Sequence, residues 1–137
     1  MQENFKFKKK LELRYSDFDM MGHVNNAMYL TYFEYVRILY TTEICHWDSK
    51  ETGLVVATAT IDFRVSIVRT SNPVIHIRCN RLGNKSFGFE YIISEENNPN
   101  TIYATGFTTM VTLDVNTNET IRIPDEYREK IKKYDHV

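Results

Sequence analysis

The hydrophobic pattern of the chain changes its period about one third of the way along. Between residues 27 and 44, apolar side chains cover most of a helical circumference and leave only a narrow polar stripe, formed by Thr31, Glu34, Arg37 and Thr41. A helix that is apolar nearly all round is typical of one wrapped by other structure. We therefore predict a buried helix from Ala27 to about Ile44.

From residue 55 onward, apolar residues alternate with polar ones, as expected of half-buried strands. This alternation predicts strands over residues 55–67, 73–82, 86–94 and 102–115, and a similar alternation predicts one before the helix, over residues 5–14. The breaks between the later strands are short and rich in turn-forming residues, so successive strands are expected to pair as antiparallel hairpins. Acidic residues directly after Pro124 predict a short terminal helix.

One strand, a long buried helix and at least four antiparallel strands form an α+β arrangement. Because the helix is apolar on nearly all sides, the sheet must curl around it. A single curled sheet leaves edges unpaired, so we expect a homodimer or homotetramer. At 137 residues, with no repeat and no low-complexity linker, the sequence is expected to form one domain over residues 1–137.

Composition narrows the possible functions. A net charge of -1 gives no long-range attraction to nucleic acid or to anionic membranes. The N-terminus lacks an apolar signal core and no apolar run approaches the roughly 18 residues of a membrane span, so we expect a cytoplasmic protein. Cys45 and Cys79 lack metal-ligand spacing and are expected to be reduced, buried thiols.

Candidate chemistry is concentrated in the polar turn before the helix. Around Gly22 it carries two carboxylates, one imidazole and two carboxamides: Asp17, Asp19, His23, Asn25 and Asn26. A carboxylate beside a helix N-terminus, whose N–H groups favour negative charge, suits attack on a carbonyl. No second histidine stands close enough for a metal site, and the common serine-nucleophile, phosphate and dinucleotide motifs are absent, so we expect no metal and no cofactor.

With these elements in this order, the chain resembles the hot-dog-fold acyl thioesterases of the 4-hydroxybenzoyl-CoA thioesterase type. The matching stretches are RYSDFD (14–19), GHVNN (22–26), Tyr29, YFE (32–34), Arg37, IDF (61–63), KSF (85–87) and IPD (123–125). The first two stretches are specific, and the others are supportive. The resemblance covers essentially the whole chain and implies a curled antiparallel sheet wrapped around one long central helix.

The resemblance also implies a reaction and its site. In the family, the second aspartate of the D-x-D pair does the chemistry, which implies that Asp19 hydrolyses an acyl-CoA thioester as nucleophile or as general base. The family polarises the thioester carbonyl with N–H groups at the start of the central helix, here about Asn26. The basic residue before Ser86, which is Lys85, matches one that holds the phosphates of coenzyme A. His23 matches the histidine of the H-V-N-N stretch in plant acyl-carrier-protein thioesterases, where it is thought to belong to the site.

The match has departures, and they leave alternatives open. Some bacterial relatives carry a histidine at the position of Asn26, and the plant enzymes carry an asparagine at that of Met21, so the plant mechanism does not transfer intact. An acyl-ACP thioesterase and a non-catalytic acyl-thioester-binding protein are the alternative functions. A hot-dog dehydratase ranks lower, because the helical acid Glu34 lies two turns from the His23 loop.

Other polar residues near the turn have simpler interpretations. Asp17 is expected to pair with a backbone group or an arginine and to shape the loop. His23 is equally compatible with a structural role and with positioning water or substrate. Glu34 and Arg37 are expected to interact with each other or with the loop above them.

Overall fold

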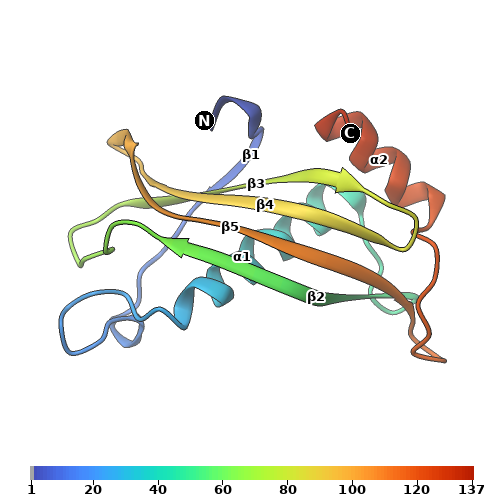
Figure 1. Ribbon diagram of the computed structural model, residues 1–137, viewed down its shortest axis with the longest axis horizontal. Coiled ribbons are helices and arrows are strands. Elements are labelled where there is room, and N and C mark those ends of the chain that lie inside the picture. Colours follow the sequence, from blue (N-terminus) through green and yellow to red (C-terminus); the bar gives the residue numbers. More distant parts are fainter. Residues whose placement is uncertain (1) are drawn as a thin grey trace.

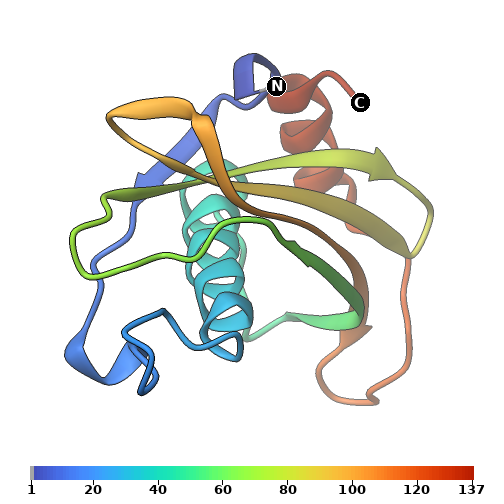
Figure 2. The same ribbon diagram turned by 60° about the vertical axis from the view of Figure 1, so that its left-hand side comes forward.

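A five-stranded antiparallel sheet curls around one long helix in the computed structural model, which describes residues 2–137 (Figure 1). The strands lie in the spatial order β1-β3-β4-β5-β2, and their bounds are β1 (Phe7–Lys10), β2 (Thr52–Phe63), β3 (Pro73–Leu82), β4 (Ser86–Glu95) and β5 (Asn98–Asp114). Helix α1 (Met28–Tyr40) lies along the concave side of the sheet (Figure 2), and α2 (Asp125–Asp135) follows β5 near the C-terminus. The predicted α+β, hot-dog arrangement is confirmed.

Helix α1 is held by aromatic packing against the inner face of the sheet. Phe33 stacks on Tyr91 of β4 with ring centroids 4.1 Å apart, and Tyr40 packs edge-on against Phe89. The α-helical part ends at Tyr40, and a π-helical turn (Thr41–Cys45) completes the predicted length. The hydroxyl of Thr41 contributes to this wider turn by donating to the carbonyl oxygen of Arg37.

The sheet covers only one side of α1. Leu30, Tyr35 and Ile38 remain 51%, 44% and 54% exposed, whereas Arg37 of the predicted polar stripe is buried. The prediction of a helix wrapped on all sides is therefore wrong for the single chain, because five strands curl around only part of the helix circumference. One face of α1, which carries these three side chains together with Thr31 and Glu34, is left facing solvent.

The strand pattern was predictable, but one pairing was not. The strands predicted over 73–82 and 86–94 match β3 and β4 within one residue, whereas β1 is much shorter than the predicted strand. The expected hairpin between the strands over 55–67 and 73–82 is wrong, since β2 pairs with β5 and not with β3. Residues 64–72 are long enough to carry the chain across the sheet from β2 to β3. Shorter turns join β3, β4 and β5 into a meander, in which β3 pairs with β4 and β4 pairs with β5.

Gly106 of β5 allows α1 to approach the sheet. A Cβ at this position would lie 2.4 Å from a ring carbon of Phe33 and 2.7 Å from the carbonyl oxygen of Thr60. Gly106→Ala is therefore expected to lower the free energy of unfolding by about 1–3 kcal/mol through overpacking, measured by denaturant titration. Gly53→Ala is the matched control, since its Cβ would approach Leu113 no closer than 3.4 Å. Equal losses in the two variants would contradict this account.

Two further predictions concern burial and membrane crossing. Cys45 and Cys79 are both buried and free, as predicted, and burial raises the pKa of each thiol to about 12. Within residues 2–137, none of the helices has the length and apolar character that crossing a membrane requires.

Candidate active site

The polar turn before α1 is a tight loop whose two arms bond to each other. Phe18 and Val24 form an isolated antiparallel bridge, and the Asp19 N–H donates to the carbonyl oxygen of His23 at 2.8 Å. At the tip, the Gly22 N–H donates to the carbonyl oxygen of Asp19, and Gly22 adopts a φ of 76°. A side chain disfavours this left-handed conformation, so glycine permits the sharp reversal.

The two carboxylate oxygens of Asp19 have different surroundings. Oδ1 accepts hydrogen bonds from the backbone N–H groups of Met21, at 2.9 Å, and His23, at 3.1 Å. Oδ2 has no hydrogen-bond partner anywhere in residues 2–137, and the residue is half-buried. The loop thus fixes the orientation of the carboxylate through one oxygen and leaves the other available.

The start of α1 leaves one backbone donor free. The carbonyl and side-chain oxygens of Asn25 accept from the N–H groups of Met28 and Ala27, both at 2.9 Å. The N–H of Asn25 itself donates to the carbonyl oxygen of Asp17 at 2.8 Å. Within the described part of the chain, the N–H of Asn26 has no acceptor. Asn25 therefore fastens the loop, and Asn26 offers the unoccupied donor.

A pocket of about 310 Å³ collects these groups. Its lining comes from the loop, the first turn of α1 and the end of β2 with the residues after it: Asp19, His23, Val24, Asn26, Tyr29, Phe63, Arg64, Val65 and Ser66. Buried Tyr29 packs its ring edge-on against Phe63, with centroids 5.0 Å apart, and burial raises the pKa of the Tyr29 phenol. The structure thus brings together three of the predicted site residues, Asp19, His23 and Asn26.

The other two predicted residues lie elsewhere. Lys85 ends the β3–β4 turn and Ser86 begins β4, and the strand register places Ser86 opposite Val111, which in turn pairs with Val55 of β2. Phe63, at the pocket, pairs with Ala104 near the other end of β5. Within one protomer, the β3–β4 turn and the Asp19 loop therefore lie at opposite ends of the sheet (Figure 1).

Two arginines near these groups were not singled out from the sequence. Arg64 lines the Asp19 pocket and directly follows the IDF stretch. Arg81 places its guanidinium nitrogens 3.4 Å from the hydroxyl of Ser86, beside Lys85. Neither arginine belongs to a sequence motif with a recognisable spacing, because each reaches its site only through the position at which its strand ends.

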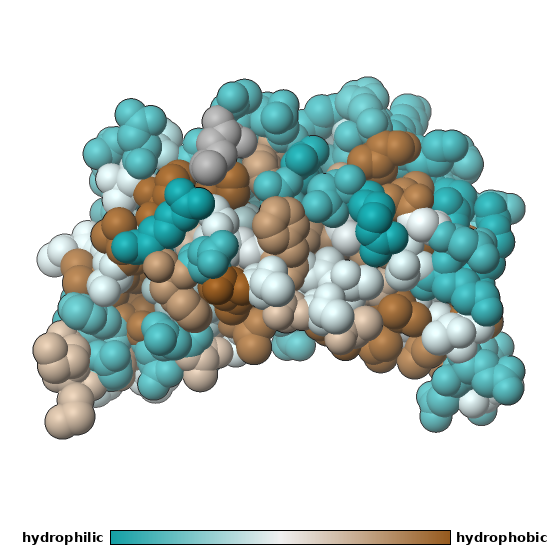
Figure 3. Space-filling model, viewed as in Figure 1, coloured by the Kyte–Doolittle hydropathy of each residue, from teal (hydrophilic) through white to brown (hydrophobic). Residues whose placement is uncertain are grey.

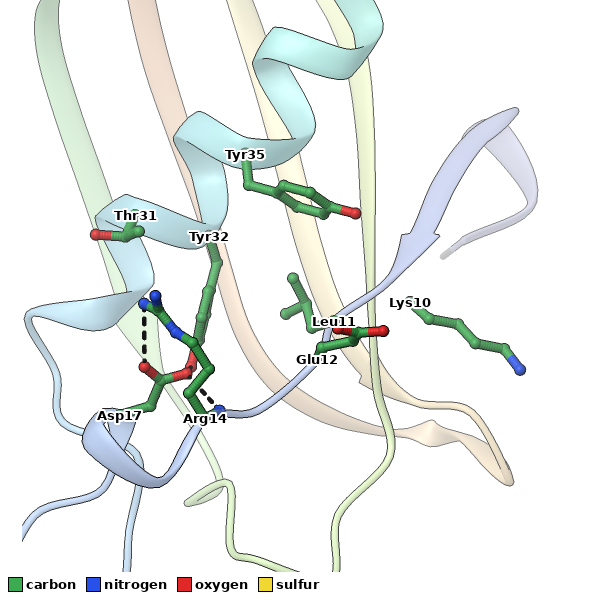
Figure 4. A pocket seen from close by; sticks show the side chains of 8 residues that line it. All are labelled: Lys10, Leu11, Glu12, Arg14, Asp17, Thr31, Tyr32 and Tyr35. Carbon is green, nitrogen blue, oxygen red and sulfur yellow. Dashed lines mark hydrogen bonds and ion pairs between the residues drawn. The ribbon is translucent and has the colours of Figure 1, made fainter.

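Asp17 faces away from the Asp19 pocket. Its Oδ2 accepts from the Tyr32 hydroxyl at 2.8 Å and from the Arg14 N–H at 3.0 Å, and the Arg14 guanidinium lies 3.4 Å from Oδ1 (Figure 4). The predicted pairing of Asp17 with backbone and an arginine is confirmed. Burial, followed by the contact with Asp17, raises the pKa of the Tyr32 phenol far above its usual range.

The predicted contact between Glu34 and Arg37 is not formed. Arg37 is buried and donates to the hydroxyl of Tyr91 at 3.2 Å, whereas Glu34 is exposed. No ion pair within residues 2–137 joins the two side chains. Both instead line a pocket of about 380 Å³ toward the C-terminal end of α1, together with Trp47 and Leu54.

Metal ligation finds no support in the side-chain arrangement. Among residues 2–137, no group of three or more histidine, cysteine, aspartate or glutamate side chains is placed to hold a metal ion.

Comparisons with known proteins agree with this fold. The uncharacterized protein YsmA of Bacillus subtilis (strain 168) is 29% identical over 129 residues, which cover 93% of this chain and 86% of that protein. A thioesterase of Thermus thermophilus, solved with coenzyme A and zinc, superimposes with a TM-score of 0.84 at 27% identity and covers 98% of each chain. The PA5185 protein of Pseudomonas aeruginosa strain PAO1 gives a TM-score of 0.89 at 24% identity, over 96% of this chain and 93% of that one.

A family model gives the assignment. The model of the thioesterase-like superfamily matches residues 13–131, a span that includes the Asp19 loop, α1 and all strands after it. The chain therefore belongs to the thioesterase-like superfamily of hot-dog-fold thioester hydrolases.

Proposed function

We propose that this protein hydrolyses acyl-CoA thioesters to the free acid and coenzyme A, with Asp19 at the reacting carbonyl. One observation carries the proposal: Asp19, with a free carboxylate oxygen, and Asn26, with a free N–H, line the same pocket. Thioester hydrolysis needs both a group that attacks or activates water and a donor for the developing oxyanion.

The Asn26 N–H and the Asp19 carboxylate would have different roles in the reaction. The N–H of Asn26 donates to the carbonyl oxygen as it becomes negative, an interaction for which one donor is typically worth about 3 kcal/mol. Asp19 Oδ2 either attacks the carbonyl carbon and expels the thiolate, leaving an anhydride that water then opens, or takes a proton from an attacking water. Both routes yield a carboxylic acid and a thiol, and the His23 ring at the pocket wall can orient the water or the substrate.

A homodimer formed through β2 would complete the binding site for coenzyme A. Strand β2 is an edge strand of twelve residues with one charged side chain, Asp62, and it exposes Val55, Val56 and Phe63. The opposite edge, β1, is four residues long and carries three lysines, a composition that blocks edge pairing. The surface over β2 is correspondingly white to brown, with little teal (Figure 3). An exposed edge of this length with a single charged side chain favours pairing with a second copy.

Two β2 strands related by a two-fold axis would run antiparallel. The Phe63 end of one strand then lies beside the Thr52 end of the other, which is also the end where the β3–β4 turn lies. The Asp19 pocket of one protomer would therefore face Arg81 and Lys85 of the partner subunit. Those side chains are suited to the phosphates of coenzyme A, which accounts for their distance from Asp19 within a single protomer.

The experiment is release of free thiol from a panel of acyl-CoAs, from short to long and aromatic, with matched acyl-ACPs run in parallel. Turnover of CoA esters supports the proposal, and the panel ranks the acyl groups. Turnover confined to acyl-ACP would replace the carrier but keep the reaction. Binding of acyl-CoA, measured by calorimetry, without turnover of any ester would overturn hydrolysis in favour of a binding protein.

A further inference from the structure

Tyr32 of α1 lies on the opposite side of the Asp19 loop from the Asp19 pocket. Its ring is buried and lines the pocket of about 350 Å³ drawn in Figure 4, in which its phenol points at the carboxylate of Asp17. It is absent from the lining of the Asp19 pocket. In the sequence, Tyr32 is one of the many apolar positions of the predicted helix. In the structure it makes the one side-chain hydrogen bond, within residues 2–137, from α1 to this loop.

The residue that Tyr32 holds is tied to both arms of the loop. The Asp17 carboxylate accepts from Tyr32 at 2.8 Å, while the Asp17 carbonyl oxygen accepts the N–H of Asn25 at 2.8 Å. Asn25 in turn fixes the first turn of α1 through Ala27. A shift of Asp17 would therefore change the distance between Asp19, two residues further along the outgoing arm, and the Asn26 N–H on the returning arm.

The loop has other attachments that keep it folded without the Tyr32 hydroxyl. The Val24 N–H donates to the carbonyl oxygen of Ile67 at 2.9 Å, and Arg14 bonds to Asp17 through both its backbone and its guanidinium. Loss of one of several bonds loosens such a loop without unfolding it. Catalytic groups need to stay within about 0.5 Å of the productive geometry, so loosening alone is costly for turnover.

We propose that Tyr32 is a positioning residue: its hydrogen bond to Asp17 locks the loop against α1 and so sets the distance between the Asp19 carboxylate and the Asn26 N–H. This proposal rests on Asp19 acting at the thioester. Tyr32 does not line the Asp19 pocket, although its ring lies 6.1 Å from that of Tyr29, which does. Because its hydroxyl bonds to Asp17 outside that pocket, it acts on the geometry of the transition state and leaves substrate binding nearly unchanged. The phenol stays protonated at any working pH, since burial and the neighbouring Asp17 raise its pKa, and it remains a donor throughout.

The test compares Tyr32→Phe with Tyr35→Phe. Both tyrosines lie on α1 and line the same pocket, but the Tyr35 hydroxyl has no hydrogen-bond partner within residues 2–137. Tyr32→Phe is expected to lower kcat for thioester hydrolysis about tenfold with KM within twofold of wild type, whereas Tyr35→Phe keeps both. In a double-mutant cycle with Asp17→Asn, the combined loss of kcat is expected to be no larger than the larger single loss. A kcat for Tyr32→Phe within twofold of wild type, or losses that multiply in the cycle, would overturn the proposal.

Amide hydrogen exchange provides a readout that needs no activity. In Tyr32→Phe, the amides of Asp19 and Asn25 are expected to exchange about tenfold faster, while those of β4 exchange at the wild-type rate. Equal acceleration in the loop and in β4 would show a purely structural role and overturn the proposal, as would unchanged loop exchange. If wild type hydrolyses no thioester, the proposed function fails on that result, and the exchange rates still decide whether Tyr32 holds the loop.

Discussion

Asp19→Asn is expected to lower kcat for thioester hydrolysis by about 10³-fold, within the range that general acid–base groups contribute. The variant should fold normally, because a carboxamide oxygen can still accept the N–H groups of Met21 and His23 that now bond to Oδ1. What disappears is the charge on the free oxygen, which is the group needed for attack or for proton transfer. KM should change little, since Asp19 is expected to act on the carbonyl and not on the carrier. Steady-state thiol release measures the effect.

Asp62→Asn is the control for this result. Asp62 is an exposed carboxylate on β2 next to Phe63, so it lies at the same end of the sheet but outside the pocket lining. Its variant should retain wild-type kcat. Wild-type turnover by Asp19→Asn would remove Asp19 from the chemistry, and equal losses in both variants would point to a general effect of charge near the pocket.

Thr58→Lys combined with Thr60→Lys is expected to turn a dimer into monomers and to abolish most of the hydrolysis. Both threonines are exposed in the middle of β2, and their alternation with Ile61 places them on the convex face of the sheet, away from α1. Two-fold pairing of β2 would set four lysines against one another. Like charges directly opposite cost up to about 1 kcal/mol a pair, so two such pairs should raise the dissociation constant by up to about 30-fold.

Sedimentation and light scattering measure the mass, and the thiol assay measures the activity of the same samples. Thr117→Lys with Thr120→Lys adds the same charge on an exposed loop after β5 and should leave mass and activity unchanged. A fully active monomer would contradict a site completed by the partner subunit. A lysine variant that remains dimeric would place the interface elsewhere.

Local pattern was sufficient for most of the elements. The alternation over 73–82 and 86–94 located β3 and β4 within a residue, because successive side chains of a strand point to opposite faces of the sheet. It was less accurate for β1, where charged residues alternate with apolar ones over a longer stretch than the four that pair with β3. The strand ends at Lys10, where its pairing with β3 stops, and the residue types along the chain do not show where that pairing stops.

The site was predictable to the extent that it is local. Asp19, His23 and Asn26 fall within eight residues of each other, and Gly22 lets that short segment fold back on itself. The N–H that remains free at Asn26 could not be predicted, since it depends on which acceptors Asn25 and Asp17 supply. Arg64 joins the pocket only because β2 pairs with β5 and its end comes to lie beside the loop.

The sequence by itself determined the order of elements, the position of the long helix and the polar turn, because hydrophobic period and turn chemistry act over a few residues. Only the tertiary structure decided that β2 joins β5 at an exposed edge, that Lys85 lies far from Asp19, and that Tyr32 bonds to Asp17. The physical reason is that pairing and packing depend on which distant surfaces bury each other. The hydrophobic period alone shows that one face of a helix or strand is buried, and it does not show which other element covers that face.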